Sequence, residues 1–243
     1  MPHRFFIDSS AVSGDTAVLG GENARHARVL RLSPGERVVL CDGDSRDYHC
    51  TVLKIGDDEI ALSVDNVEMN ASEPGVRVTL FQGLPKSDKM DRIIQKAVEL
   101  GAAEIIPVQT RCSVSRINAD TRKKTARWRK IAEEAARQCG RGVLPAVGEA
   151  LGFAEAVKYS SALDEAYLAY EFYQGPPLAT AFEHSAGRSV GIFIGPEGGF
   201  DAEEAALATD GGLRLISLGK RILRTETAGP AAIVALMCAR KEM

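Results

Sequence analysis

Two glycine-containing segments near the C-terminal end of the chain carry residue types from which a ligand site can be built. In residues 191–201 an apolar strand runs into the turn Gly195-Pro196-Glu197-Gly198-Gly199 and then into a helix start. Glycines let a backbone approach a ligand closely, and ligands of open α/β sheets bind beyond the carboxyl ends of the strands. The turn matches neither the dinucleotide-binding pattern Gly-x-Gly-x-x-Gly nor a phosphate-binding loop ending in Gly-Lys-Ser/Thr. It therefore indicates a different cofactor site, or else a tight connection that binds nothing.

The second segment, residues 215–230, repeats the order of strand, glycine turn and helix. Charged and hydroxyl side chains gather at this helix start: Arg221, Arg224, Glu226 and Thr227. Thr225 can cap the helix, and Pro230 fits only within its first turns. This pattern favours a functional site, although a surface ion pair beside a capped helix would give the same residues.

The elements that must position these segments alternate between strand and helix. Strands are expected at residues 76–82, 104–108, 166–169, 189–194 and 213–218, and helices from Asp88, over 118–139, from Asp201 and from Thr225. Such alternation predicts an α/β fold with a mostly parallel sheet covered on both faces. Asp201 and Glu204 form a capping-box-like helix start.

The first seventy residues have a different pattern of short strands. Apolar runs at 37–40, 48–55 and 60–64 are separated by turn residues such as Ser33-Pro34-Gly35. This spacing suggests a small barrel, and residues 70–75 then read as a linker. We therefore expect two domains, residues 1–70 and 76–243.

Composition narrows the class of protein further. The 243 residues are 45% hydrophobic and 26% charged, the balance of a soluble globular protein. The chain has no apolar stretch near the ~20 residues of a membrane helix and no secretion-signal core at its start, so we expect a cytoplasmic protein without membrane contact. The five cysteines are scattered without a Cys-x-x-Cys pair, and we expect no metal.

Positive charge is concentrated in one region. Residues 111–141 contain ten Lys or Arg and three acidic residues, a local charge of +7 in a chain whose net charge is −3. A concentrated basic face in an acidic protein suits a polyanion such as RNA. A solvated helix face is the equally simple alternative.

Taken together, the two C-terminal segments resemble the RsmE family, methyltransferases of the knotted SPOUT superfamily that act on small-subunit ribosomal RNA. The resemblance rests on the turn at 195–199 and on Leu218-Gly219-x-Arg221-Ile222-Leu223-Arg224-Thr225-Glu226-Thr227-Ala228. It extends through Leu84-Pro85-Lys86 to Arg4-Phe5-Phe6 and to His26-x-x-Val29-Leu30-Arg31, so it covers essentially the whole chain.

This resemblance implies an N-terminal PUA-like small β-barrel and a SPOUT-type α/β domain with a mostly parallel sheet and a C-terminal trefoil knot. It implies a homodimer that uses S-adenosylmethionine to make N3-methyluridine in the decoding region of 16S ribosomal RNA, free or in the small ribosomal subunit. By the same resemblance the loops of the knot would hold the cofactor, through Leu168, Ala169, Ile194, Gly195, Gly198, Gly199, Leu218, Gly219, Ile222, Leu223 and Ala228.

Uracil N3 carries a proton and becomes a nucleophile only when that proton leaves. Arg224 is our candidate for stabilising the developing oxyanion, and Glu226 or Glu197 for accepting the proton. Either carboxylate could instead be a backbone cap or an ion-pair partner.

We expect RNA contacts, mostly to phosphates, from Arg4, Arg25, His26, Arg31, Lys86, Arg111, Arg122, Lys123, Arg127 and Arg141. His26 could equally be a packed barrel residue. Trp128 suits core packing better than base stacking, and Lys96 and Glu99 could simply pair with each other.

Two other functions remain open. A ribose 2′-O-methyltransferase of the same superfamily would share the knot, but the full-length resemblance argues against it. A non-catalytic RNA-binding or ribosome-assembly factor would need only the barrel and the basic helix. Both glycine turns and residues 224–228 argue for an enzyme.

Overall fold

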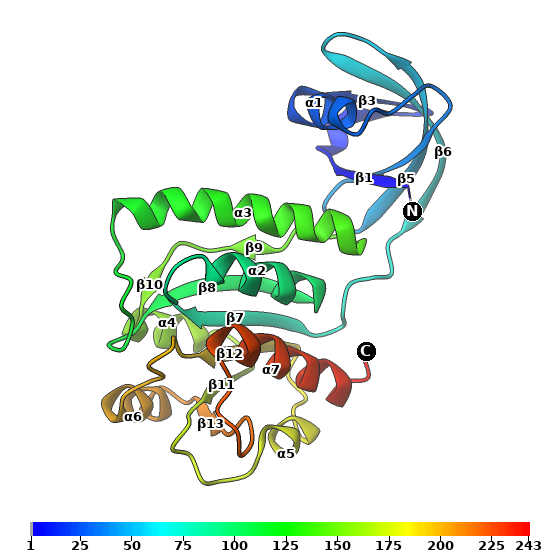
Figure 1. The fold of residues 1–243 in the computed structure, drawn as a ribbon. Helices are drawn as coiled ribbons and strands as arrows, with labels where there is room; N and C mark the ends of the chain where they lie inside the picture. The colour runs from blue at the N-terminus through cyan, green and yellow to red at the C-terminus, as the bar shows by residue number, and fades with distance from the viewer. Residues whose placement is uncertain (1) are drawn as a thin grey trace. The chain divides into compact units, whose positions relative to one another are not determined.

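The computed structural model describes residues 2–243, apart from the side chains at positions 119, 120 and 122, and the chain folds as two units (Figure 1). Unit 1 comprises Met1–Glu73 together with Ala136–Leu144, and unit 2 comprises Pro74–Ala135 and Pro145–Met243. Unit 1 is thus built from two stretches of sequence, because the last turn of a long helix and the loop after it belong to it.

The N-terminal stretch of unit 1, described from residue 2, forms a sheet with one helix and one 3₁₀ turn. Its elements are β1 (His3–Phe6), η1 (Ser9–Ala11), β2 (Val12–Ser13), β3 (Thr16–Gly20), α1 (Gly21–Val29), β4 (Arg37–Cys41), β5 (Arg46–Ile55) and β6 (Glu59–Met69). The strands pair in the order β1-β4-β5-β6-β3-β2, with β1 parallel to β4 and every other pair antiparallel.

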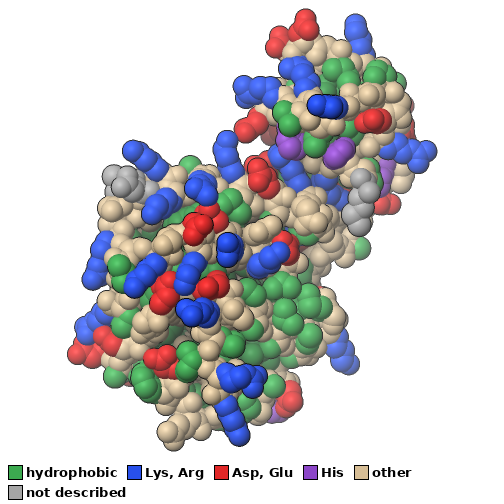
Figure 2. All heavy atoms as spheres, viewed as in Figure 1, with side chains coloured by type: hydrophobic (Ala, Val, Ile, Leu, Met, Phe, Trp, Pro, Cys, Tyr) green, Lys and Arg blue, Asp and Glu red, His purple; other side chains and the backbone are tan. Residues whose placement is uncertain are grey.

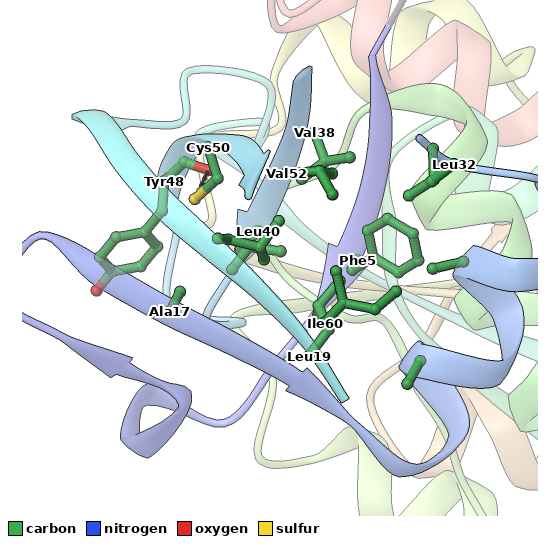
Figure 3. Packing of buried hydrophobic residues seen from close by; sticks show 13 residues of the cluster. Phe5, Ala17, Leu19, Leu32, Val38, Leu40, Tyr48, Cys50, Val52 and Ile60 are labelled. Atoms are coloured by element: carbon green, nitrogen blue, oxygen red, sulfur yellow. Dashed lines mark hydrogen bonds between the residues drawn. The ribbon is translucent and has the colours of Figure 1, made fainter. Parts of the chain in front are cut away.

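The core of unit 1 follows from strand periodicity. Alternate residues of a strand point to the same face, which brings Ala17 and Leu19 of β3 inward beside Ile60 and Leu62 of β6. Figure 3 shows Leu19 and Ile60 beside Phe5 of β1, which is fully buried. Ala24 and Ala27 of α1 complete the cluster, because their small side chains let the helix pack closely on the sheet.

A buried ion pair completes unit 1. The Arg4 guanidinium donates to both carboxylate oxygens of Asp47, and Asn70 donates a further hydrogen bond of 2.8 Å to Asp47. Burial raises the pKa of Asp47, but the hydrogen bonds from Arg4 and Asn70 outweigh it and hold the pKa below its usual range. The second stretch is attached by Glu73, whose carboxylate accepts hydrogen bonds from the Arg141 side chain.

Unit 2 is an α/β structure with a parallel sheet in the order β10-β8-β7-β12-β11-β13 and β9 paired to β8. Its elements are β7 (Arg77–Gly83), α2 (Lys89–Glu99), β8 (Ala102–Gln109), α3 (Ala119–Cys139), β9 (Ala146–Val147), β10 (Leu151–Gly152), α4 (Phe153–Ser160), β11 (Glu165–Ala169), α5 (Leu178–Glu183), β12 (Ser189–Ile194), α6 (Ala202–Asp210), β13 (Arg214–Ile216) and α7 (Thr225–Ala239). Because the strands are parallel, their carboxyl ends meet at one edge.

Helices cover both faces of this sheet. Leu80 and Phe81 follow each other in β7 and therefore point to opposite faces. Leu80 lies against Gly229 of α7, and α7 also packs against α2 and α5. Phe81 stacks on Phe193 and meets Tyr159 of α4, which packs against α6. The predicted parallel α/β fold is confirmed at this level.

Two absences hold for the part of the chain that the structure describes. No helix there is both long and apolar enough to cross a bilayer. No group of three or more His, Cys, Asp or Glu side chains there is placed to bind a metal ion.

Candidate active site

A cavity of about 380 Å³ opens in unit 2 where β11, β12 and β13 end. These strands are neighbours in the sheet, so the loops that follow them come together at one edge. The cavity is lined by the strand ends, the loops after them and two helices: Ala169 at the end of β11 with Tyr170 and Glu171 after it, Ile194 at the end of β12 with residues 195–197, Gly199 and Phe200 after it, Ser217, Leu218, Gly219 and residues 221–224 after β13, Thr225 and Ala228 of α7, and Lys89 of α2.

The turn after β12 folds back on itself so tightly that only glycine fits at position 195. A Cβ added to Gly195 would lie 2.8 Å from the Cα of Gly199, closer than real Cβ contacts come. Gly199 itself has φ +67°, a left-handed conformation that favours glycine. A Cβ on Gly83, at the end of β7, would lie 2.5 Å from the Cδ of Pro196. The turn is therefore packed directly on the neighbouring strand end.

A buried hydrogen-bond chain joins this turn to β7 and α7. The Thr225 hydroxyl donates to the Gly195 carbonyl (2.7 Å) and accepts from Nε2 of Gln82 (2.9 Å). Gln82 is fully buried and Thr225 is 4% exposed, so water does not compete for these groups. The chain fixes the carbonyl of Gly195 at the edge of the cavity.

Replacing Thr225 by valine tests this hydrogen-bond chain. The variant keeps the shape of the side chain but leaves Gln82 and Gly195 without this partner, so we expect the free energy of unfolding to fall by about 1–3 kcal/mol. Urea unfolding measures the change. Thr209→Val is the matched control, because that exposed hydroxyl bonds only to Ala205 one turn earlier in α6, and it should cost less than about 0.5 kcal/mol. Equal costs for the two variants would contradict the proposed role.

A lysine lies between the two candidate carboxylates. Nζ of Lys89 is 2.9 Å from Oε1 of Glu197 and 3.3 Å from Oε2 of Glu226. Glu197 also accepts a hydrogen bond of 3.2 Å from the backbone N–H of Lys86. Residue patterns do not indicate a role for Lys89, which stands in the sequence as an ordinary residue of a helix start.

Both carboxylates stay ionised to lower pH than usual. Burial raises the pKa of Glu197, but hydrogen bonds from Lys89 and from backbone N–H groups outweigh it and lower the pKa below its ordinary value. For Glu226 a hydrogen bond from its own backbone N–H has the largest effect, and Lys89 and Arg224 lower the pKa further. Both groups therefore carry negative charge at neutral pH.

Of the three predicted catalytic residues, Glu197 and Arg224 line the cavity. Glu226 is outside the lining but is held beside it through Lys89. The interpretation of the carboxylates as ion-pair partners is thus correct for both, and it does not exclude a chemical role.

Most of the predicted cofactor residues surround this one cavity: Ala169, Ile194, Gly195, Gly199, Leu218, Gly219, Ile222, Leu223 and Ala228. Leu168 lies instead in the core of unit 2, fully buried, because strand alternation turns it toward a sheet face. Gly198 faces Cys112, whose Cβ would be 3.0 Å from an added Cβ. The rule that sites follow strand ends would also have found Tyr170 and Glu171.

Several predicted RNA contacts are engaged in ion pairs. The Arg4 and Arg141 side chains are held by Asp47 and Glu73 inside unit 1, with side-chain exposures of 12% and 5%. In unit 2, Arg111 pairs with Glu203 and Arg127 pairs with Asp91. Figure 2 shows basic and acidic side chains intermingled over the visible face of unit 2. The basic region is therefore partly neutralised.

The remaining candidates differ in their surroundings. Within the described part of the chain, Arg25, Arg31, Lys86 and Lys123 are exposed and form no ion pair with another described side chain. His26 packs edge-on against the Phe5 ring. The side chain of Arg122 lies outside the described residues.

Two neighbouring expectations concern the helices α2 and α3. Trp128 is 5% exposed and donates to Asp91 at 3.2 Å, so it packs rather than stacks on a base. Lys96 and Glu99 pair with each other at 2.8 Å.

Comparison with known proteins gives matches to both parts of the chain. Residues 72–237 match the family model of an RNA methyltransferase domain, and residues 19–65 match that of an RNA methyltransferase PUA domain. The chain is 32% identical to ribosomal RNA small subunit methyltransferase E of Bacillus subtilis, over 96% of this chain and 95% of that one. It is 34% identical to the Mycobacterium tuberculosis protein of the same name, over 96% and 90% of the two chains.

Solved methyltransferase structures are also similar to this chain over nearly its whole length. Ribosomal RNA small subunit methyltransferase E from Neisseria gonorrhoeae, bound to S-adenosyl methionine, superposes with a TM-score of 0.87 at 31% identity, covering 98% of this chain and 97% of that one. A putative methyltransferase from Legionella pneumophila in complex with the same cofactor gives a TM-score of 0.84 at 27% identity, covering 98% of each chain.

Proposed function

The chain belongs to the ribosomal RNA small subunit methyltransferase E family, and on that premise we propose that it transfers a methyl group from S-adenosylmethionine to N3 of a uridine in the decoding region of 16S ribosomal RNA. The observation that carries the proposal is the cavity formed by the three loops after β11, β12 and β13, with two carboxylates, Lys89 and Arg224 at or beside its wall. The site thus has groups for holding a cofactor and for moving a proton.

The residues of the cavity fit S-adenosylmethionine. A volume of about 380 Å³ lies within the range of small-molecule sites. Ile194, Leu218 and Leu223 line the cavity with apolar side chains, which suits an adenine ring. Glu171 lies against Gly199, about 3.1 Å from where a Cβ would be, and adds negative charge beside a positively charged cofactor.

In the proposed mechanism the cofactor supplies an electrophilic methyl group, and the protein deprotonates and orients the uracil. The N3 proton would pass to the carboxylate of Glu226 or Glu197, and the freed electron pair of N3 would form the bond to the methyl carbon. The bond between that carbon and the sulfonium sulfur would break in the same step, and the sulfur would keep its electron pair and leave as neutral S-adenosylhomocysteine. Arg224 stabilises the negative charge that spreads to the uracil oxygens. The uridine must be unpaired, because N3 lies on the Watson–Crick edge, and exposing it costs ~a few kcal/mol.

For the RNA we propose phosphate contacts from the exposed cations Arg25, Arg31, Lys86 and Lys123. We propose that residues 1–70 form a PUA-like barrel that binds RNA and that residues 76–243 form a SPOUT-type domain whose cofactor loops are knotted. The reaction takes place in the cytoplasm, on ribosomal RNA or on the small subunit.

We further propose a homodimer that uses α7. Ala232, Ile233 and Leu236 of this helix are buried within unit 2, whereas Ala231 and Val234 remain partly exposed. Figure 2 shows hydrophobic side chains gathered over the region of α7. Such a face suits a second copy of the chain.

The experiment that tests the function uses small-subunit particles that lack the modification. They are incubated with the protein, with and without S-adenosylmethionine, and analysed by reverse transcription and by nucleoside mass spectrometry. We expect a cofactor-dependent stop in the decoding region and methyluridine in the digest, because N3 methylation blocks base pairing. Methylation without a stop would indicate a ribose 2′-O-methyltransferase. Absence of methylation on both particles and naked RNA would indicate a binding protein.

A further inference from the structure

Lys89 occupies a position that local electrostatics disfavour. It is the first residue of α2, where the unpaired N–H groups of the helix favour an acidic side chain over a basic one. Asp88 precedes it and forms no side-chain cap. A lysine at this point is therefore explained by its partners elsewhere in the fold rather than by the helix.

Its partners come from two other segments of unit 2. Glu197 lies in the turn after β12, and Glu226 is the second residue of α7. The three side chains are between 26% and 28% exposed, so they are shielded from bulk water without being sealed from it. Lys89 and Glu197 both line the cavity. The ammonium group thus ties three elements together at the point where the proposed reaction takes place.

The charges in this group are unequal. One ammonium serves two carboxylates, which leaves a net charge of −1. The further charged side chain that acts on the group is Arg224, beside Glu226, and Lys86 contributes a backbone N–H to Glu197. Because Lys89 contacts both carboxylates, either one can take up a proton while the ammonium stays paired with the other.

We propose that Lys89 is a positioning residue for methyl transfer, which holds Glu197 and Glu226 side by side at the cavity so that one of them receives the uracil proton. This inference rests on the proposed function. Lys89 keeps its own protons throughout. The N3 proton moves to a carboxylate oxygen and afterwards leaves to solvent, to which these side chains remain partly open.

Removing the ammonium has a consequence that a purely structural role would not have. Two carboxylates left facing each other repel, and the pKa of one of them rises. The acid side of the pH–rate profile would then move to higher pH. A lysine that only stabilised the fold would lower the rate by the same factor at every pH.

The experiment compares Lys89→Met, Lys89→Arg and the control Lys96→Met with the wild-type protein. Lys96 lies in the same helix and also forms a Lys–Glu pair, but with Glu99 outside the cavity. Single-turnover rates are measured from about pH 3.5 to about pH 9, over the range in which circular dichroism shows each protein folded, so that the acid side of the profile is covered. In parallel, the side-chain carboxyl carbons of Glu197 and Glu226 are followed by NMR titration in the free protein, which requires no activity.

For Lys89→Met we expect the half-maximal point on the acid side to rise by about one pH unit or more, and at least one of the two glutamates to titrate at higher pH. Lys89→Arg should restore the wild-type profile, and Lys96→Met should match the wild type. Unchanged glutamate titrations in Lys89→Met, or a loss of rate that is uniform across pH, would overturn the inference. If the wild-type protein shows no methyl transfer but the pKa of a glutamate still rises in Lys89→Met, the proposed function is overturned. The inference that Lys89 holds the two carboxylates would still be supported.

Discussion

Replacing Gly195 by alanine is expected to weaken S-adenosylmethionine binding about 100-fold, equivalent to roughly 2.7 kcal/mol. The added Cβ would lie 2.8 Å from the Cα and 2.9 Å from the carbonyl carbon of Gly199. These are backbone atoms, so no side chain can rotate away and the turn itself must open. Its opening would move the Gly195 carbonyl away from Thr225 and deform the wall of the cavity. Calorimetric titration with the cofactor measures the loss.

The matched control for this substitution is Gly20→Ala in unit 1. A Cβ there would meet no atom within 4 Å, and Gly20 has no left-handed conformation to lose. Cofactor affinity in Gly20→Ala should therefore equal that of the wild type. The thermal unfolding temperature of both variants is measured as well, so that a loss of affinity caused by a changed cofactor site is distinguished from one caused by unfolding. Wild-type affinity in a folded Gly195→Ala protein would show that the turn does not form the cofactor site.

Replacing the carboxylate that accepts the proton should lower the single-turnover rate about 10²–10⁴-fold, the usual contribution of a general base. Glu226→Gln and Glu197→Gln are therefore compared, with cofactor affinity measured for each. The amide keeps the size of the side chain but cannot accept the N3 proton. We expect one variant to show the large loss and the other a smaller one through its contact with Lys89.

Glu149→Gln serves as the control, because this exposed carboxylate pairs with Arg129 outside the cavity. Its rate should match the wild type. If both Glu226→Gln and Glu197→Gln keep near-normal rates, neither carboxylate is the base and the mechanism is wrong.

The direction of the two pKa shifts adds a pH dependence. The base must be ionised to accept a proton, and the pKa of each glutamate lies below its ordinary value of 4.5. The ionised form therefore persists to lower pH than in a free glutamate and is lost as pH falls through the lowered pKa. Where the protein remains folded, the carboxylate should not limit the wild-type rate until pH drops below that ordinary value.

Residue patterns predicted the larger elements of the fold well. The apolar run at 189–194 coincides with β12, and the Asp201–Glu204 capping box is present at the start of α6. The patterns did not reveal α1, whose buried residues are only Ala24 and Ala27, too small to mark a helical stripe. The helices α4 and α5 have only 8 and 6 residues. Helical periodicity is recognised over longer windows, so the patterns did not indicate these helices.

The part of the candidate site formed by loops after strand ends was predictable. The contacts between side chains that are distant in sequence were not. Family resemblance and the glycine turns predicted most of the cavity, and the family itself is confirmed. Lys89 could not be found in this way, because nothing near it in sequence indicates that Glu197 and Glu226 approach it. The same limitation applies to Arg4 and Arg141. Their positive charge is visible in the sequence, but nothing near them in sequence shows that they pair with Asp47 and Glu73.

Because unit 1 is built from two separate stretches of sequence, it cannot be completed early in translation. During translation the first 73 residues leave the ribosome early, and domains usually fold as they emerge. Here the amide of Asn70 bonds to the carbonyl of Gly140, and Glu73 accepts from Arg141, Gly142 and Val143. These partners are synthesised after β7, α2 and β8 of unit 2. The nascent chain therefore completes its first unit only when a large part of the second has already appeared.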